Sequence, residues 1–260
     1  MTGVKNITAC ALIIGNEVLS GRTADANLNW LALRLTEKGI RLAEARVLPD
    51  VEEVIIDAVN ECREKYTYVF TTGGIGPTHD DITALCIAKA FGTTLERNAE
   101  IVRLLEERIG KDKMNEARLK MADVPVGGSL IPNPVSGVPG FRIGNVFVMA
   151  GVPSIMRGMF EGIAGELEEG ARMLSRSVIA FLPEGTIADG LNAIQERHPA
   201  TEIGSYPFRK DGVFGCSLVT RTTDKDELDA AVEEIREMIR DLGATPVEEN
   251  EIDPEDLPAG

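Results

Sequence analysis

Short apolar runs alternate with amphipathic stretches along the first two thirds of the chain. The runs at 7–14, 41–48 and 68–70 favour extended structure and predict strands. Between them, apolar residues recur at helical spacing within 28–35 and 54–62, which predicts two helices. Parallel strands need helical crossovers, so this order predicts a mainly parallel sheet covered on both faces, a three-layer α/β fold.

The rest of this region has a less regular pattern. A helix is expected over 82–92 and a more polar helical stretch over 98–121. The passage 124–141 is rich in Gly and Pro and cannot stay regular for long. A hairpin over 141–149 and a helix over 154–168 follow. Ligands gather at the carboxyl ends of parallel strands, so the loops that follow the strands are the expected site.

The last third of the chain has a different order of elements. The patterns predict a strand over 177–182, a helix over 187–194, a hairpin of strands 202–207 and 213–220, and a helix over 228–239. This β-α-β-β-α order predicts a small α+β domain with its own core.

Three segments follow from these patterns. They are an α/β domain over 1–170, a small α+β domain over 171–243 and a tail over 244–260. The tail has six acidic residues, no basic residues and three prolines, which predicts a mobile segment. The hairpin of the small domain is expected to turn at Asp211 and Gly212.

Composition excludes several classes of function. The formal net charge of −15 argues against a general nucleic-acid binder, because the phosphate backbone favours clustered Lys and Arg. The four cysteines are far apart, which fits buried free thiols in a reducing compartment better than disulfides or a zinc site. The apolar run at 7–14 is too short to span a bilayer. We expect a cytoplasmic protein that binds neither nucleic acid nor membrane.

The segment Tyr68–Thr83, YVFTTGGIGPTHDDIT, is the strongest candidate for chemistry. Its pattern predicts a strand, a glycine loop and a helix, which leaves backbone N–H groups free at the positive end of the helix. A phosphate is the default ligand there. The spacing of Gly73, Gly74 and Gly76 matches neither the phosphate-loop nor the dinucleotide pattern. On the glycines alone, a tight turn without a ligand is an equal alternative.

The acidic residues beside this loop favour a function. Asp80 and Asp81 are expected at the helix start, where carboxylates also serve as caps. With Thr78 they form an oxygen-rich corner able to hold Mg²⁺ against a phosphate. Asp80 is explained equally well as a cap. Asp50 precedes a helix that has Glu53 in its first turn, so the residues alone favour a capping role for Asp50.

The remaining polar residues have ordinary structural explanations. Glu17 and Asp25 flank a turn, and Asp25 fits a cap of the first helix. His79 is better explained as a solvated loop residue than as a ligand or base. His198 lies at a helix end and fits a capping position. Covalent catalysis is not expected, since no Ser or Cys has a nucleophile setting.

The sequence resembles a known family. TTGGIGPTHDDIT resembles the signature of the molybdopterin-binding domain, shared by molybdenum-cofactor adenylyltransferases and the competence/damage-inducible protein A family. Further blocks are similar to the second group in the same order: IIGNEVLSGRTADANLNWLA, NEARLKMADVP, IPNPVSGVPGF and AGVPSIMRGMF. The small domain resembles a K-homology-like module without the GXXG loop, so RNA binding is not implied. The chain is similar to a short form without the deamidase domain of longer members.

The resemblance implies chemistry at a phosphoanhydride bond. For the competence-related group it implies a metal-dependent pyrophosphatase acting on ADP-ribose, and related domains of FAD synthases hydrolyse FAD. For the adenylyltransferases it implies transfer of AMP to molybdopterin in molybdenum cofactor biosynthesis. A non-catalytic module that binds a pterin or nucleotide is a third alternative. The expected cofactor is Mg²⁺ or a similar divalent metal, with K⁺ as a further candidate, and the expected assembly is a homodimer or homotrimer.

The resemblance also assigns roles to individual residues. It implies that Asp81 acts in metal binding and catalysis and that Asp50 is a second catalytic acid. The second metal ligand is expected to be Asp80, from the oxygen-rich corner, or Asp50. The residues matched to substrate binding are Glu17, Gly21, Asn27, Gly73, Gly74, Gly76, Thr78, Lys120, Asn133, Pro134, Gly137 and Pro139. Leu119 stands where many members carry arginine, so the choice of substrate is not carried over.

Overall fold

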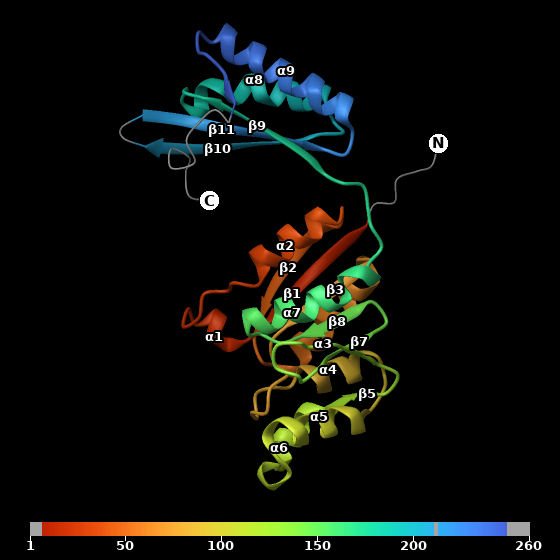
Figure 1. Cartoon of the computed structure of the whole chain (residues 1–260). Helices are drawn as coiled ribbons and strands as arrows, with labels where there is room; N and C mark the ends of the chain where they lie inside the picture. The colour runs from red at the N-terminus through yellow and green to blue at the C-terminus, as the bar shows by residue number, and fades with distance from the viewer. Residues whose placement is uncertain (1–6, 211–212, 249–260) are drawn as a thin grey trace. The chain divides into compact units, whose positions relative to one another are not determined.

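Six strands of the amino-terminal part form one mixed sheet, in the order β2-β1-β3-β8-β7-β6 (Figure 1). The computed structural model describes residues 7–210 and 213–248 and divides into two units after Ala171. In the first unit the parallel strands are β1 (Thr8–Ile14), β2 (Arg41–Leu48), β3 (Tyr68–Thr72) and β8 (Val146–Met149). The antiparallel edge consists of β7 (Gly140–Ile143) and β6 (Ser129–Ile131).

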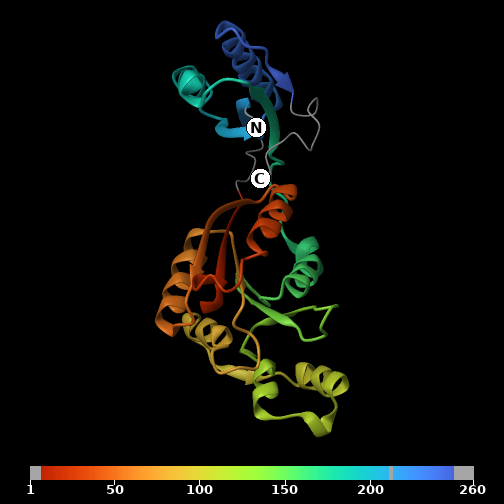
Figure 2. The same ribbon diagram turned by 90° about the vertical axis from the view of Figure 1, so that its left-hand side faces the viewer.

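Helices cover both faces of this sheet (Figure 2). The helices on one face are α2 (Leu28–Glu37) and α7 (Pro153–Ile163). Those on the other are α3 (Glu52–Lys65) and α4 (Thr83–Ala90), while α5 (Ala99–Ile109) lies beyond α4 and away from the sheet. Each set buries its apolar stripe against one face of the sheet, which confirms the predicted three-layer α/β fold.

Several short elements connect these layers. They are α1 (Asn16–Leu19), β4 (Leu95–Arg97), η1 (Lys111–Lys113), α6 (Glu116–Leu119), η2 (Lys120–Ala122), β5 (Asp123–Pro125) and η3 (Ala164–Glu166). Strands β4 and β5 pair with each other in a separate two-stranded sheet. The chain between α4 and β6 therefore forms a small structure of its own beside the main sheet.

Two predicted helices are shorter than expected. The helical stretch predicted over 98–121 is interrupted, because Gly110, with φ 93°, ends α5 and only one-turn helices follow it. The helix expected over 154–168 ends at Ile163 and continues only as η3. In both cases the residues after the helix have a composition typical of helices, but the structure forms only short turns there.

The second unit is a four-stranded antiparallel sheet with two helices. The sheet order is β10-β11-β9-β12. The elements are β9 (Leu174–Ala180), α8 (Glu184–Arg197), β10 (Glu202–Lys210), β11 (Val213–Thr222), α9 (Lys225–Asp241) and β12 (Val247–Glu248). Both helices contribute to one buried core with β9 and β11. The predicted β-α-β-β-α order is confirmed.

One prediction about the carboxyl-terminal end needs correction. Val247 and Glu248 pair with Ile179 and Val178 of β9, so the segment after Gly243 is not tail throughout. A two-residue strand is too short to give a periodic signal, and the acidic residues around it are typical of a disordered segment. The expected turn at 211–212 and the rest of the tail lie outside the described residues.

Two expectations from composition can be compared with the structure. The four cysteines are free and buried, as predicted. Burial raises the pKa of the Cys86 thiol to about 11, which keeps that group protonated near neutral pH. No helix within 7–210 or 213–248 is long and apolar enough to cross a bilayer.

His198 joins the two helices of the second unit. It is the C-cap residue of α8, and its Nδ1 lies 3.1 Å from Glu227 Oε2 of α9. Its Nε2 lies 3.2 Å from Glu234 Oε1. The hydrogen bond with Glu227 raises the pKa of His198, burial opposes the rise, and Glu234 adds to it.

We expect the second unit to lose stability as pH rises through the pKa of folded His198, above its ordinary value of 6.5. The protonated ring binds both glutamates, so its stabilisation is complete below the pKa of the unfolded chain and disappears on deprotonation. Hydrogen exchange of the α8 and α9 amides in the full chain, corrected for intrinsic rates between about pH 6 and pH 9, measures this loss. H198Q should show no such dependence. An unchanged dependence in H198Q would contradict the assignment.

Candidate functional site

Two glycines allow the loop after β3 to pass close to the end of β1. Gly73 and Gly74 have φ of 101° and 67°, in the left-handed region. A Cβ at Gly73 would lie 2.1 Å from the carbonyl oxygen of Ile14, and one at Gly74 would lie 2.1 Å from Thr83 Oγ1. No larger side chain fits at either position without moving the backbone. The tight turn is therefore a real constraint, whether or not a ligand binds.

Thr83, the first residue of α4, closes this loop. Its N–H donates to Gly74 O at 3.0 Å, and its Oγ1 donates to Gly73 O at 3.0 Å. The helix therefore begins after Asp80 and Asp81, and no side chain caps it. The expectation that these acids lie at the helix start is wrong, because they belong to the loop and bind within it.

Thr78 brings two carboxylates and a lysine together. Asp81 Oδ2 accepts hydrogen bonds from Thr78 N at 2.7 Å and from Thr78 Oγ1 at 2.6 Å. Asp80 Oδ1 is also within hydrogen-bonding distance of that hydroxyl, which lowers the pKa of Asp80. Lys120 Nζ donates to Thr78 O at 2.6 Å. The predicted residues Thr78, Asp80, Asp81 and Lys120 therefore form one polar cluster.

The glycine loop has backbone donors available beside this cluster. Within the described chain, the amides of Gly74, Ile75 and Gly76 donate to no protein group. All three residues are only half-buried. Consecutive free N–H groups of a loop are a common site for an oxyanion.

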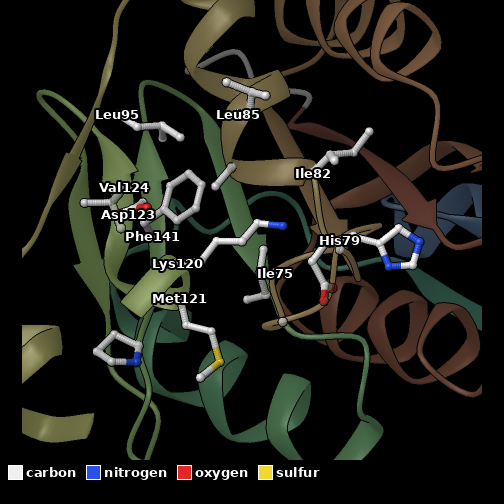
Figure 3. Close-up of a pocket in the computed structure, with 15 residues that line it drawn as sticks. Ile75, His79, Ile82, Leu85, Leu95, Lys120, Met121, Asp123, Val124 and Phe141 are labelled. Atoms are coloured by element: carbon white, nitrogen blue, oxygen red, sulfur yellow. The ribbon is translucent and has the colours of Figure 1, made fainter. Parts of the chain in front are cut away.

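A cavity of about 350 Å³ opens between this loop and an apolar wall (Figure 3). Figure 3 shows Lys120 between Phe141, Leu95 and Val124 on one side and His79 and Ile75 on the other. Its lining residues are Gly74, Ile75, Gly76, His79, Asp81, Ile82, Ala84, Leu85, Leu95, Lys120, Met121, Asp123, Val124, Pro139 and Phe141. The cavity therefore has a mainly apolar wall, which also contains the carboxylate of Asp123, opposite the glycine loop and Asp81.

The loops at the carboxyl ends of the parallel strands converge, as predicted. Gly15 N donates to Leu48 O at 3.0 Å, and a Cβ on Gly151 would lie 3.3 Å from Gly73 Cα. The side chain of Asp50 takes part, since its Oδ2 accepts from Asn16 N at 2.9 Å. The capping role of Asp50 is wrong, because Val51 occupies the N-cap of α3 and no side chain caps it. Asp50 lines neither cavity described here.

The other predicted site residues are divided between two places. Glu17 and Asn27 line a second cavity, of about 60 Å³. Asn133 is buried and binds within its own loop, where its Oδ1 accepts from the backbone N–H groups of residues 135 and 136. Neither Asn133 nor the neighbouring Pro134 and Gly137 lines a cavity. Gly21 lies on an exposed turn and lines neither one.

Residues 10–169 match the family model described as a probable molybdopterin binding domain. This segment contains the glycine loop, both cavities and nearly all of the six-stranded sheet. The chain belongs to that family. Residues 172–248 match a second model, described as the middle domain of FAD synthase.

Individual relatives place the chain among the CinA-type members of the family. A CinA-like protein of Citrifermentans bemidjiense is 37% identical over 69% of this chain and 48% of its own length. A probable FAD synthase of Caenorhabditis elegans is 30% identical over 89% of this chain and 50% of its own length. The chain thus spans about half the length of these two relatives. The crystal structure of CinA, of unknown function, from Thermoplasma acidophilum is 30% identical with a TM-score of 0.59, covering 62% of this chain and 99% of that one.

Part of the cavity wall in this family member was not found from the sequence. Leu95, Asp123 and Val124 belong to β4 and β5, which are three residues long each. Such strands are too short for an alternating pattern. Arg97 holds Asp123 in place, with Nε 2.9 Å from Oδ1 and Nη2 3.3 Å from Oδ2. The sequence signal for this pairing is the opposite charge of Arg97 and Asp123, which are distant in the chain.

The predicted metal can be tested against the donors present. Among the described residues, no group of three or more His, Cys, Asp and Glu side chains is arranged to hold a metal ion. Asp80 and Asp81 offer two carboxylates beside one threonine. Mg²⁺ commonly binds through one or two carboxylates and completes its shell with water and substrate phosphates. The pair fits a metal bound together with its substrate and does not fit a permanent protein cage.

We expect G73A to lower the free energy of unfolding of the first unit by about 2 kcal/mol or more, because left-handed strain adds to the collision with Ile14 O. Urea unfolding followed by the fluorescence of Trp30, the only tryptophan, measures the change. G92A is the matched control, since Gly92 has φ 63° with nothing within 4 Å of its Cβ. The control should lose only about 1 kcal/mol. Equal losses in both variants would show that the contact with Ile14 is not limiting.

Proposed function

We propose that this chain hydrolyses the phosphoanhydride bond of a nucleotide pyrophosphate, such as ADP-ribose or FAD, with a divalent metal. The observation that carries the proposal is the larger cavity, in which an apolar wall faces free loop amides, an ammonium group and a carboxylate. A ligand with a flat ring and adjoining phosphates is complementary to both halves. The volume of about 350 Å³ lies in the range of small-molecule sites.

The apolar half suits a planar ring. Leu85, Leu95, Val124 and Phe141 come from four different elements and line one side of the cavity. Burying a ring against them removes apolar surface from water. Adenine, isoalloxazine and pterin rings all meet this requirement, so this half does not choose among them.

The polar half suits a pyrophosphate. The free amides of Gly74, Ile75 and Gly76 can each donate to a phosphate oxygen, and Lys120 adds a positive charge. Asp81, with Asp80, would hold a divalent metal against the same oxygens. When bound, such a metal neutralises charge at phosphorus and lowers the pKa of a water molecule. Thr78 contacts both carboxylates, so they already lie close together before a metal binds.

The relatives support this class of chemistry. One of them is a probable FAD synthase, and the second unit matches the middle domain of FAD synthase. Both findings favour an enzyme that acts on nucleotides. The assay below tests whether the reaction is hydrolysis and whether it needs a metal.

We expect D81N to hydrolyse ADP-ribose and FAD about a hundredfold or more slowly than the wild type, because it removes a carboxylate charge that would hold the metal against the phosphates. Chromatography of products formed from ADP-ribose, FAD, NAD and ATP, with and without Mg²⁺, provides the measurement. D112N is the matched control, since Asp112 is exposed on η1. Full hydrolysis by D81N would exclude the proposed role of Asp81.

Adenylylation of molybdopterin is a second candidate function. The description of the matching family model, a probable molybdopterin binding domain, favours it. This function requires transfer of AMP from ATP to bound molybdopterin. Lack of any molybdopterin affinity would exclude it. Ligand affinity without metal-stimulated product would instead favour a non-catalytic binding module.

A further inference from the structure

The smaller cavity lies on the other side of the glycine loop from the larger one. Thr72, directly before the loop, lines the smaller cavity, while Gly74 lines the larger. The loop after β1 and the start of α7 supply the remaining walls. The two cavities therefore flank the segment whose amides are proposed to bind the phosphates.

Two buried side-chain oxygens at this smaller cavity have no partner. Asn27 and Thr72 are 4% and 3% exposed. Asn27 Nδ2 donates to Gly151 O at 2.8 Å, which fixes the orientation of the amide. Asn27 Oδ1 and Thr72 Oγ1 make no hydrogen bond with any described residue. Buried polar atoms are nearly always hydrogen-bonded, so these two oxygens at one cavity are available to a group from outside the chain.

The surroundings select the chemistry of that group. Glu17 and Asp25 line the cavity, and no Lys, Arg or His does so in the described chain. Asp25 Oδ1 already accepts from Asn27 N at 3.2 Å and Leu28 N at 2.8 Å, so its charge is fixed in place. A phosphate would meet two carboxylates and an amide oxygen. A group that donates hydrogen bonds, such as a hydroxyl, would be stabilised instead.

We propose that the smaller cavity binds hydroxyl groups of the sugar attached to the second phosphate of the ligand. This inference rests on the proposed function. With a ring in the larger cavity and the pyrophosphate on Gly74–Gly76, the ligand continues past Gly73 to Thr72. In ADP-ribose and FAD the group at that position is a polyhydroxylated sugar or sugar alcohol. A volume of about 60 Å³ corresponds to about two water molecules, which admits hydroxyl groups and excludes a ring system.

The chain offers a matched pair of variants for a test. Thr71 and Thr72 are adjacent in β3, both buried, and both have an Oγ1 without a partner. Only Thr72 lines the cavity. Valine has the shape of threonine without the hydroxyl, and removing an unpartnered hydroxyl breaks no internal hydrogen bond. T72V and T71V should therefore both fold, which thermal unfolding verifies.

Calorimetric titration with ADP-ribose and with ADP, in buffer containing a metal chelator, measures binding without turnover. ADP lacks the second sugar. We expect the wild type to bind ADP-ribose more tightly than ADP, and T72V to bind ADP-ribose about three- to tenfold more weakly, the factor for one hydrogen bond. ADP affinity should be the same in T72V and the wild type. T71V should match the wild type for both ligands.

The outcomes separate this inference from the proposed function. An unchanged ADP-ribose affinity in T72V would overturn the sugar site. Equal weakening of both ligands by T72V would also overturn it. A wild type that binds neither nucleotide and forms no product from ADP-ribose or FAD with Mg²⁺ would reject the proposed function, and the sugar site with it.

Discussion

The contact between Gly73 and the carbonyl oxygen of Ile14 is the constraint on which the site depends. A side chain at Gly73 would come within 2.1 Å of that oxygen, so the loop crosses the end of β1 only because Cβ is missing. The crossing also brings Gly151, after β8, against the same backbone. Three strand ends thus meet around one glycine, and both cavities arise as the spaces on either side of it.

The two sides of this crossing differ in the hydrogen-bond donors that they offer. Free amides and Lys120 lie beside the larger cavity, together with the carboxylates of Asp81 and Asp123, whereas no Lys, Arg or His of the described chain lines the smaller one. In a chain with a net charge of −15, the larger cavity therefore holds the donors that the proposed phosphate would need. The net charge of the chain therefore does not determine whether a phosphate or a hydroxyl group suits each cavity; the local donors and acceptors do.

The sequence predicts those features that repeat along the chain. Strand β2 has the predicted bounds, because exposed and more buried positions alternate along its eight residues. The polar cluster of Thr78, Asp81 and Lys120 was also expected, although only a family resemblance connected Lys120 to the loop. The helix predicted over 82–92 begins one residue later, at Thr83. The sequence could not show that Asp80 and Asp81 belong to the loop, because this depends on the hydrogen bonds from Thr83 to Gly73 and Gly74. The wall from β4 and β5 and the strand β12 arise from long-range pairing of two or three residues, which leaves no local pattern.

The small β4–β5 sheet has an evolutionary consequence. It supplies Leu95 and Val124 to the cavity wall but pairs with none of the six strands of the main sheet. Substitutions in this segment can reshape the space for a ring while the glycine crossing and the phosphate donors stay unchanged. Under the proposed function, such changes would alter which ring fits and would leave the donors to the pyrophosphate in place.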